Sequence, residues 1–387
     1  MSRLIIYDTS NFTDYPVGGQ LTSVSNFLRY VCETQPQHTD DILLVGVTLD
    51  SCLVGKLQEI EMYGRKIKYI PVTAATVDQS AVRHSLRLSY ARGILRYGKK
   101  IRINKDDCNY IQTPEAYMPV KMLCGKAVCF VFSHGTYGRM EDRVRFFRKA
   151  PLIRRLFQDY LMSVIKGART VFILDSDSER DYTGIAKKMI RVDNSVIPVP
   201  FIGRDAAAEG RRTECFYAGR LSKVKNVGPI IQAAEKAPAE MNLHLTVIGA
   251  GEEETYLKTL AHDRTEFTGA MTPYHVHEFM KKADILIMNS IFEGVPMTIL
   301  ESLSYSIPVI STDVGGIGDV LSFGTDSELT DGGADSIIAA LSKIQADYGR
   351  YSRAAYDKSG RFDYRKVNGV ILDELDTVLG WRTSEGQ

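Results

Sequence analysis

The 387-residue sequence lacks several features that would mark a membrane, secreted or metal-binding protein. No apolar run approaches the ~20 residues that a membrane-spanning helix needs. The N-terminus, MSRLIIYDTSNF, turns polar after three apolar residues, which is not the pattern of a secretory signal. The six cysteines are scattered, and no second close pair completes a zinc spacing. We therefore expect reduced thiols in a cytoplasmic protein.

The sequence also lacks a strong charge of either sign. Its net charge of +1 provides no overall attraction to nucleic acid. Neither a short-period repeat nor a low-complexity segment interrupts the chain. With 44% hydrophobic and 25% charged residues, the composition is that of a globular protein, and the length suggests two domains.

Short apolar segments alternate with amphipathic ones, which predicts parallel sheets covered by helices on both faces. Residues 198–214 interrupt this alternation with proline, glycine, alanine and charge, as a linker does. We predict two doubly wound α/β domains, residues 1–205 and 206–363, and a C-terminal helix at about 364–380 that packs back on the first domain. The buried strands are expected at residues 2–8, 41–49, 66–72, 127–133, 170–176, 215–221, 243–251, 265–270, 283–290 and 307–313, and helices at 21–35, 227–237 and 298–305.

The stretch from Asn289 to Gly316 places two glutamates, Glu293 and Glu301, eight residues apart between an apolar strand and a helix. Ligands of such sheets bind at the carboxyl ends of the strands. The first N–H groups of a helix that begins near Met297 have no partner within it and can bind an anion. Carboxylates beside such amides suit a ligand with a diphosphate and several hydroxyls, as a nucleotide-sugar has. Either glutamate alone could instead simply favour the helix dipole.

Two other segments could contact a diphosphate. Arg220 and Lys225 follow the first strand of the second half, although a solvated basic loop is the commoner role for such residues. Gly18 and Gly19 lie between the first strand and the first helix, where backbone N–H groups can approach a phosphate. The glycines would serve equally well in a tight turn without a ligand.

The segment VIGAGEEETYL is interpreted as structural. It lacks the third glycine of a dinucleotide fingerprint, and its acidic residues would repel a pyrophosphate. This broken pattern also argues against a nicotinamide-dependent dehydrogenase.

In their order, these segments resemble the retaining glycosyltransferases of family 4, which have the GT-B fold. The resemblance rests on GRLSKVKN, FEGVPMTILES and TDVGG, and on the two glutamates separated by seven residues. It covers the second half and is weaker in the first, where VGGQ and SHG carry it. MNS in place of proline-serine and Asp319 in place of glutamate are conservative departures. The resemblance implies two Rossmann-like domains that face a central cleft.

The resemblance also implies a role for each matching residue. Arg220 and Lys225 would bind the diphosphate and stabilise it as it leaves, and Glu301 would hold the ribose hydroxyls. Glu293 and the backbone carbonyl of His134 would stabilise the cation-like sugar, although His134 could instead be a core or capping residue. The catalytic residues are then Glu293, His134, Arg220 and Lys225. The donor site would contain Gly18, Gly19, Arg220, Lys225, Glu293, Gly294, Val295, Pro296, Met297, Thr298 and Glu301.

Asp175 and Asp177 form a DxD triplet, which in the other large glycosyltransferase fold binds a metal that bridges the diphosphate. Here the triplet lies far in sequence from the diphosphate cations and precedes a segment that resembles a capped helix. We therefore expect a capping role, no metal site and no cofactor, with UDP or GDP as the nucleotide of the donor substrate.

The first half would bind the acceptor, a glycan or lipid-linked glycan. Residues 83–105 and 143–161 mix arginine and lysine with apolar residues, which suits an anionic membrane surface as well as a solvated helix face. No stacking motif indicates a nucleic-acid partner. By analogy with similar proteins, we expect a role in bacterial surface polysaccharide or glycolipid assembly, in the cytoplasm or peripherally on the plasma membrane.

Two alternatives remain open. A GT-B relative such as a nucleotide-sugar epimerase or phosphorylase would share the fold, although no cofactor lysine of a phosphorylase can be identified. A non-catalytic nucleotide-sugar-binding or scaffold protein would have no need to keep Arg220, Lys225, Glu293 and Glu301 together.

Overall fold

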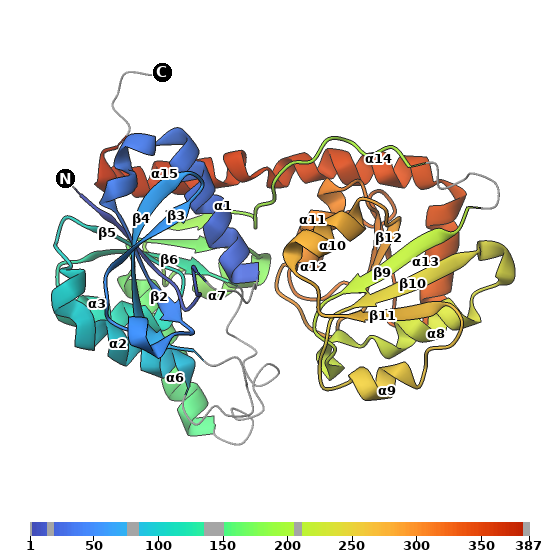
Figure 1. Cartoon of the computed structure of the whole chain (residues 1–387), viewed down its shortest axis with the longest axis horizontal. Coiled ribbons are helices and arrows are strands. Elements are labelled where there is room, and N and C mark those ends of the chain that lie inside the picture. The colour runs from blue at the N-terminus through green and yellow to red at the C-terminus, as the bar shows by residue number, and fades with distance from the viewer. Residues whose placement is uncertain (1, 14–18, 76–84, 135–150, 205–210, 382–387) are drawn as a thin grey trace. The chain divides into compact units, whose positions relative to one another are not determined.

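The computed structural model describes residues 2–13, 19–75, 85–134, 151–204 and 211–381. The chain divides into two compact units (Figure 1). The first contains Met1–Asp193 and Arg365–Gln387, and the second contains Asn194–Tyr364. Each unit has its own sheet and its own core, as predicted for a chain of two α/β domains.

The first unit is built on an eight-stranded sheet with the strand order β3-β4-β2-β1-β5-β6-β7-β8. Its order reverses between β1 and β5, so the carboxyl ends of these two strands form a topological switch point. The strands are β1 (Leu4–Tyr7), β2 (Ile42–Thr48), β3 (Gln58–Met62), β4 (Arg65–Ala74), β5 (Cys108–Ile111), β6 (Val128–Ser133), β7 (Thr170–Ile173) and β8 (Met189–Arg191).

One strand departs from the parallel arrangement that we expect. β3 pairs with β4 in the antiparallel direction, while the other pairs of this sheet are parallel. Tyr63 and Gly64 join the two strands with φ of 52° and 70°, which is the backbone of a tight hairpin turn. The EMYGRK sequence contains this turn signal, but the polar, half-exposed β3 lacks the apolar run by which the other strands are recognised.

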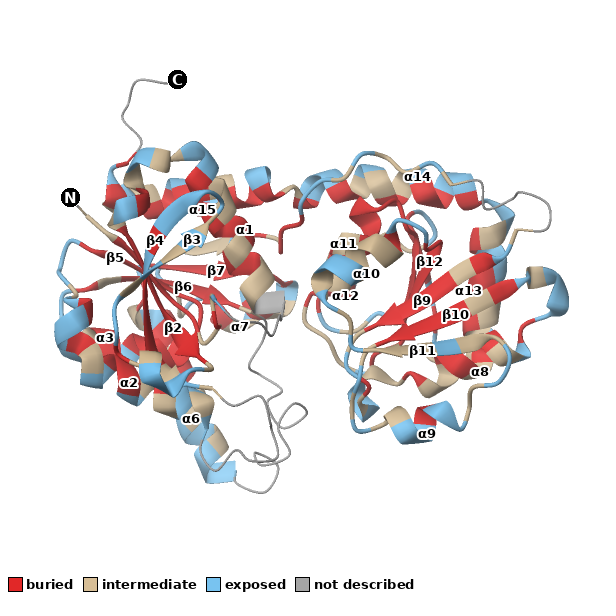
Figure 2. Cartoon of the chain, in the orientation of Figure 1, coloured by how far each residue is buried: buried red, intermediate tan, exposed pale blue. Residues whose placement is uncertain are grey.

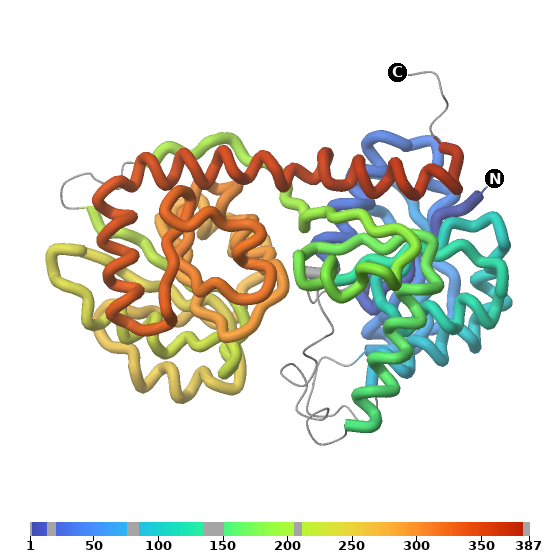
Figure 3. The backbone as a smooth tube through the Cα atoms, turned by 180° about the vertical axis from the view of Figure 1, so that it is seen from behind, coloured from blue at the N-terminus to red at the C-terminus, as the bar shows by residue number. Residues whose placement is uncertain are grey.

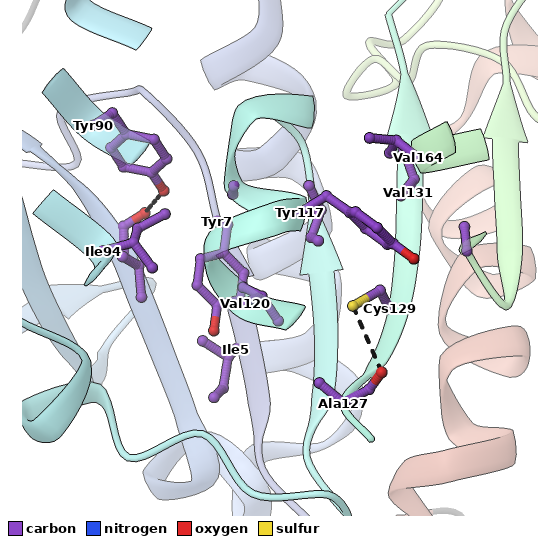
Figure 4. Packing of buried hydrophobic residues seen from close by; sticks show 14 of the residues in the cluster. Ile5, Tyr7, Tyr90, Ile94, Tyr117, Val120, Ala127, Cys129, Val131 and Val164 are labelled. Carbon is purple, nitrogen blue, oxygen red and sulfur yellow. Dashed lines mark hydrogen bonds between the residues drawn. The ribbon is translucent and has the colours of Figure 1, made fainter. Parts of the chain in front are cut away.

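Helices cover both faces of this sheet. Tyr90 and Ile94 of α2, Tyr117 and Val120 of α3, and Val164 of α6 pack with Ile5 and Tyr7 of β1 in one buried cluster (Figure 4). On the opposite face, Phe27 of α1 meets Tyr110 of β5 with ring centroids 5.3 Å apart. The helices are α1 (Gly19–Thr34), α2 (Leu86–Ile101), α3 (Tyr117–Leu123), α6 (Pro151–Gly167) and α7 (Ser176–Tyr182), with 3₁₀ turns at Pro36–Asp41, Ser51–Leu53 and Pro114–Ala116.

The C-terminal helix α15 (Tyr364–Leu379) lies against the first unit (Figure 3). Glu374 accepts a hydrogen bond of 2.6 Å from the Thr170 hydroxyl and forms an ion pair with Lys188. Beyond the helix, Trp381 stacks on His38 with ring centroids 4.9 Å apart. Residues close to the end of the chain thus complete a domain that begins at its start.

The second unit contains a six-stranded sheet in the order β11-β10-β9-β12-β13-β14, and every pair in it is parallel. Numbered from β9, this order is 3-2-1-4-5-6, which is that of the Rossmann dinucleotide-binding sheet. The switch point lies between β9 and β12. The strands are β9 (Thr213–Ala218), β10 (Leu243–Ile248), β11 (Thr265–Gly269), β12 (Ile285–Met288), β13 (Val309–Ser311) and β14 (Ser327–Leu329).

The helices of the second unit also pack on both faces. Ile230 and Leu341, from α8 and α13, belong to one core cluster, and Phe279 of α10 packs on Phe216 from the other side. Figure 2 shows β9, β10 and β12 almost wholly buried, whereas the edge strand β11 is partly exposed. The helices are α8 (Gly228–Lys236), α9 (Glu254–Lys258), α10 (Pro273–Met280), α11 (Met297–Ser304), α12 (Ile317–Val320), α13 (Ala334–Ala346) and α14 (Tyr348–Ser359), with 3₁₀ turns η5 (Lys223–Lys225), Ala239–Met241 and Gly360–Phe362.

The division between the units falls before Asn194, whereas the sequence predicts a boundary after residue 205. Asn194 donates a hydrogen bond of 3.0 Å from Nδ2 to the Val295 carbonyl. Arg204 donates to the carbonyls of Tyr305 and Met280, each at 2.8 Å. These polar contacts hold residues 194–204 on the second unit, although their composition is that of a linker.

Candidate functional site

The loops that follow β9 and β12 lie side by side because these strands are neighbours in the sheet. The loop after β9 carries Arg220 and Lys225, and the loop after β12 carries Glu293 and leads into α11. Most of the predicted donor site is therefore collected at the switch point of one sheet, where open α/β sheets bind their ligands.

Lys225 and Glu293 form an ion pair, and both side chains are largely buried, at 23% and 11% exposure. The Ser290 hydroxyl donates a second hydrogen bond to the same carboxylate oxygen, Oε1 of Glu293, at 2.8 Å. The cation predicted to bind a diphosphate and the carboxylate predicted to face the sugar are thus direct partners. A phosphate group, which is also an anion, could replace the Glu293 carboxylate as the partner of the Lys225 ammonium.

Backbone contacts hold the two loops together. Asn289 is fully buried, and its Nδ2 donates to the carbonyls of Asn226 and Gly332 at 3.1 and 3.0 Å. The N–H of Ile291 donates to the Val224 carbonyl at 2.8 Å. The position of Lys225 relative to Glu293 is therefore fixed by the backbone on both sides of the ion pair.

The TDVGG segment, residues 312–316, packs against the Glu293 loop and forms hydrogen bonds with its backbone. Gly315 has φ of +60°, and a Cβ atom at this position would lie 1.9 Å from the Glu293 carbonyl oxygen. Gly316 donates its N–H to the Gly294 carbonyl at 3.1 Å, and the Thr312 hydroxyl donates to the Ser290 carbonyl at 2.7 Å. Glycine is required at position 315 because any side chain would displace the loop that carries Glu293.

Helix α11 begins at Met297, as the sequence predicts, with Pro296 as its N-cap and no side-chain cap. Within the described part of the chain, no recorded hydrogen bond involves the N–H of Met297 or Thr298. These two groups lie at the positive end of the helix dipole. N–H groups in this position can bind an anion.

Glu301 lies one turn into α11, and its side chain is 18% exposed. Burial raises the pKa of this carboxyl from 4.5 to about 7. His277 of α10 approaches it with Nε2 at 3.8 Å from Oε1, while its Nδ1 lies 3.0 Å from the Tyr305 hydroxyl. Burial also lowers the pKa of His277. Near neutral pH this carboxyl can therefore donate a hydrogen bond to a hydroxyl when it is protonated and accept one when it is ionised.

Arg220 is more exposed than Lys225 and pairs with Glu252 at 3.5 Å. Glu252 belongs to the GAGEEE segment, whose backbone packs closely on the Arg220 loop. Gly249, with φ of +146°, would place a Cβ 1.9 Å from the Gly219 carbonyl oxygen, and Gly251 would clash in the same way with Leu221. The two glycines are needed for this close approach.

The remaining predicted residues of the second unit have different environments. Val295 is buried, and its carbonyl accepts the Asn194 hydrogen bond, so it anchors the loop. Gly294 and Pro296 are partly exposed beside it. Pro296 accepts a hydrogen bond from Ile299 at 3.2 Å at the start of α11.

In the first unit, Gly19 is the first residue of α1, and Gly18 lies outside the described residues. His134 follows β6, and its Nε2 lies 2.7 Å from Oε1 of Gln112, at the end of β5. Burial, with a smaller contribution from the Arg87 guanidinium, lowers the pKa of His134 to about 3. The imidazole is therefore neutral and held beside the switch point of this unit.

The DxD triplet has the capping role that the sequence predicts. Asp175 is the N-cap of α7, and its Oδ1 accepts from the N–H of Ser178 at 2.6 Å. Asp177 is partly exposed and pairs with Arg180 at 2.7 Å. Across the described ranges, no three His, Cys, Asp or Glu side chains gather in a way that could hold a metal ion.

In the second unit, a pocket of about 340 Å³ lies between the segment that follows β9 and helix α9. None of the predicted site residues lines it. Lys223, Gln232 and Tyr256 are among the side chains that line it. No helix in the described part of the chain is both long and apolar enough to cross a bilayer.

Several residues that support the site are not apparent from the sequence alone. Ser290, Asn289 and Thr312 hold the Glu293 loop, and His277 lies beside Glu301. A Ser-x-x-Glu spacing, present at Ser290 and Glu293, is the one local signal that could have indicated such a contact.

Residues 202–361 match the family model described as Glycosyl transferases group 1, which covers most of the second unit. The chain is 27% identical over 199 residues to the lipopolysaccharide 1,6-galactosyltransferase of Salmonella typhimurium, covering 49% of this chain and 53% of that protein. It is 29% identical over 178 residues to the O-antigen biosynthesis glycosyltransferase WbnH of Escherichia coli, with 45% and 49% covered. The chain spans about half the length, or less, of the curated relatives it matches.

Solved structures share the fold over almost the whole chain. Sucrose-phosphate synthase from Thermosynechococcus elongatus superposes with a TM-score of 0.77 at 13% identity, covering 99% of this chain and 100% of that one. The lipopolysaccharide outer core galactosyltransferase WaaB has a TM-score of 0.67 at 19% identity, with 97% and 100% covered. Anabaena HepE in complex with UDP-glucose has a TM-score of 0.66 at 17% identity, with the same coverage. The predicted GT-B fold is confirmed, and the group 1 glycosyl transferase family is supported for the second unit.

Proposed function

We propose that this chain is a retaining glycosyltransferase of family 4, which transfers a sugar from a nucleotide-sugar to a hydroxyl of a glycan or lipid-linked glycan. The observation that carries the proposal is the ion pair of Lys225 with Glu293 beside the start of α11, at the switch point of a Rossmann sheet. Phosphate-binding and hydroxyl-binding groups are thereby adjacent, as a nucleotide-sugar requires.

In the proposed donor complex, the diphosphate lies at the N-terminus of α11 and against Lys225 and Arg220. The ammonium of Lys225 then exchanges its carboxylate partner for a phosphate oxygen. Glu293 keeps its hydrogen bond from Ser290, and its carboxylate also accepts hydrogen bonds from hydroxyls of the sugar. Glu301 accepts from the ribose hydroxyls. Supporting contacts to the donor from Gly18, Gly19 and His134 belong to the same proposal.

The proposed reaction breaks the bond between the anomeric carbon and the diphosphate oxygen, and the electron pair leaves with the diphosphate. Lys225 and Arg220 stabilise the charge that develops there. The acceptor hydroxyl oxygen forms the new bond on the same face, and its proton passes to the leaving phosphate. No step in this scheme needs a metal or another cofactor.

The proposed setting is the assembly of a bacterial surface polysaccharide or glycolipid at the inner face of the plasma membrane. It is supported by two relatives, one named as a lipopolysaccharide 1,6-galactosyltransferase and the other as an O-antigen biosynthesis glycosyltransferase. HepE and trehalose-6-phosphate synthase are solved with UDP or a UDP-sugar, so UDP is the first nucleotide to test.

The proposal is tested by incubating the protein with labelled UDP- and GDP-sugars and with extracted glycolipid acceptors, and following the labelled sugar. Transfer with retained anomeric configuration is expected. Glu293→Gln should lower turnover at least 100-fold, the order that removal of one charge-stabilising group costs. A released epimer of the donor sugar would instead identify an epimerase. Donor binding without turnover under all conditions would identify a non-catalytic binding protein.

A further inference from the structure

Positive and negative residues are nearly equal in number over the whole chain, but not on three helices of the first unit, α2, α3 and α6. The full sequence contains 48 Lys and Arg residues against 47 Asp and Glu. Helix α2 contains five Lys or Arg residues, α3 one and α6 three, whereas Asp159 is the one acidic residue in these three helices. Such a separation of charge creates a local field that the net charge conceals.

The same three helices expose large apolar side chains. Leu88 of α2, Met122 of α3 and Leu152 of α6 are 58%, 69% and 70% exposed. Met118, Ile153 and Leu156 are also exposed on α3 and α6. An exposed leucine by itself needs no explanation, but a group of them on adjoining helices marks an interaction surface.

These helices form one continuous layer on one face of the sheet (Figure 1). Gly98 of α2 lies so close to Leu123 of α3 that a Cβ would approach its side chain to 2.4 Å. Gly167 of α6 is packed as tightly against the Tyr117 hydroxyl. The inner side chains belong to the core of Figure 4, so the opposite sides of all three helices face outward.

On α2 the outward residues alternate in character. Leu88, Arg92, Leu95 and Lys99 follow one another at intervals of four, three and four residues, which places them on one stripe of the helix. All four are exposed. The buried Tyr90, Ile94 and Ile101 lie on the opposite side. Cations are therefore interleaved with apolar side chains along the exposed edge.

We propose that the outward side of α2, α3 and α6, the basic-apolar face, binds the surface of a membrane that contains anionic lipid. Leucine, isoleucine and methionine side chains can enter the acyl boundary, while the long arms of arginine and lysine reach lipid phosphates. Each cation held near an anionic surface strengthens binding about fivefold.

Other occupants fit this face less well. A second copy of the chain would bring two faces of like charge together. A nucleic acid would pair with the cations but would leave the apolar side chains of α3 and α6 unexplained. Residues 143–150, the basic start of the second segment that the sequence analysis singles out, lie outside the described residues and are not used in this argument.

The face would hold the first unit at the bilayer, where a lipid-linked acceptor is available. This consequence rests on the proposed function, but membrane binding itself does not. The basic-apolar face combines two segments that are separate in sequence, 83–105 and 151–161. It also includes α3, which has no basic cluster of its own.

The test is co-sedimentation of the full chain with phosphatidylcholine vesicles, with and without phosphatidylglycerol. The wild-type protein should bind the anionic vesicles, and binding should weaken with salt. The double variants Leu152→Ser/Leu156→Ser and Arg92→Gln/Lys99→Gln should each bind at least tenfold more weakly. Matched control variants are Leu329→Ser/Val370→Ser and Lys236→Gln/Lys282→Gln, which change exposed residues outside the face and should bind as the wild type does.

Absence of binding to anionic vesicles would overturn the inference, as would equal losses in the face variants and their controls. Binding of UDP or GDP is measured on the same samples. Vesicle binding that fails while nucleotide binding persists would contradict the basic-apolar face alone. Nucleotide binding that fails while vesicle binding persists would contradict the proposed function alone.

Discussion

The buried carboxyl of Glu301 should make the stability of the protein depend on pH in an unusual direction. Its pKa is raised from 4.5 to about 7 in the folded protein, because burial disfavours the charged form. Below about pH 4.5 the group is protonated in both states and costs the fold nothing. As pH rises from about 4.5 to about 7, the unfolded chain ionises this carboxyl while the folded protein keeps it protonated, so stability is lost progressively and the loss is complete above about pH 7.

The loss can be estimated from the shift in pKa. One pKa unit corresponds to about 1.4 kcal/mol, so the shift amounts to roughly 2 to 3 kcal/mol once the partial exposure of the side chain is allowed for. Glu301→Gln has nearly the same shape and no charge. It should therefore be more stable than the wild type by roughly 2 to 3 kcal/mol at about pH 8, and no more stable at about pH 4.

The assay is urea unfolding of both proteins across this pH range, followed by a probe of the second unit. Glu254→Gln is the matched control, because it removes a partly exposed carboxylate that pairs with Lys258, and it should not be more stable than the wild type at about pH 8. The reasoning is refuted if Glu301→Gln is less stable than the wild type above about pH 7. That result would mean that Glu301 is ionised and held by His277 of α10, whose Nε2 lies 3.8 Å from Oε1 of Glu301.

The remaining predictions concern the ion pair, its support and metal ions. Lys225→Ala should weaken binding of the nucleoside diphosphate at least tenfold in calorimetric titration, whereas Lys223→Ala, on the same turn, should change it little; equal effects would move the phosphate site elsewhere. Gly315→Ala should lower the free energy of unfolding by about 2 kcal/mol or more, because its Cβ would meet the Glu293 carbonyl, whereas Gly349→Ala, in the open first turn of α14, should be neutral or stabilising. Sugar transfer should persist after treatment with a chelator; a loss that magnesium restores would return Asp175 and Asp177 to consideration as metal ligands.

The sequence is sufficient to predict the strands that are apolar throughout. The segments that contain β1, β2, β9 and β12 stand out because strands buried on both faces must be continuously apolar. β5 is short, and its CNYI sequence includes the buried polar residue Asn109, so the apolar pattern misses it. β3 is missed because only one of its faces packs and its partner runs antiparallel.

The candidate site is predictable where chain order determines position. Lys225 and Glu293 follow strands that the Rossmann order makes neighbours, so the sequence brings both to one edge of the sheet. Their direct pairing, and the pairing of Arg220 with Glu252, depend on side-chain directions that no periodicity encodes. The raised pKa of Glu301 likewise depends on how deeply its side chain is buried, which is a property of packing.

The most direct test of the account is a thermal-shift screen of the purified protein against UDP, GDP and ADP and their sugars. A nucleotide at 100 times its dissociation constant stabilises the folded state by about 2.7 kcal/mol, which is readily visible as a rise in melting temperature. The account predicts a selective rise with one of these nucleoside diphosphates and its sugar, and a smaller rise in Lys225→Ala. No rise with any of them, in the presence of vesicles and acceptor extract as well as without, would contradict the claim that the switch point of the second unit binds a nucleotide-sugar.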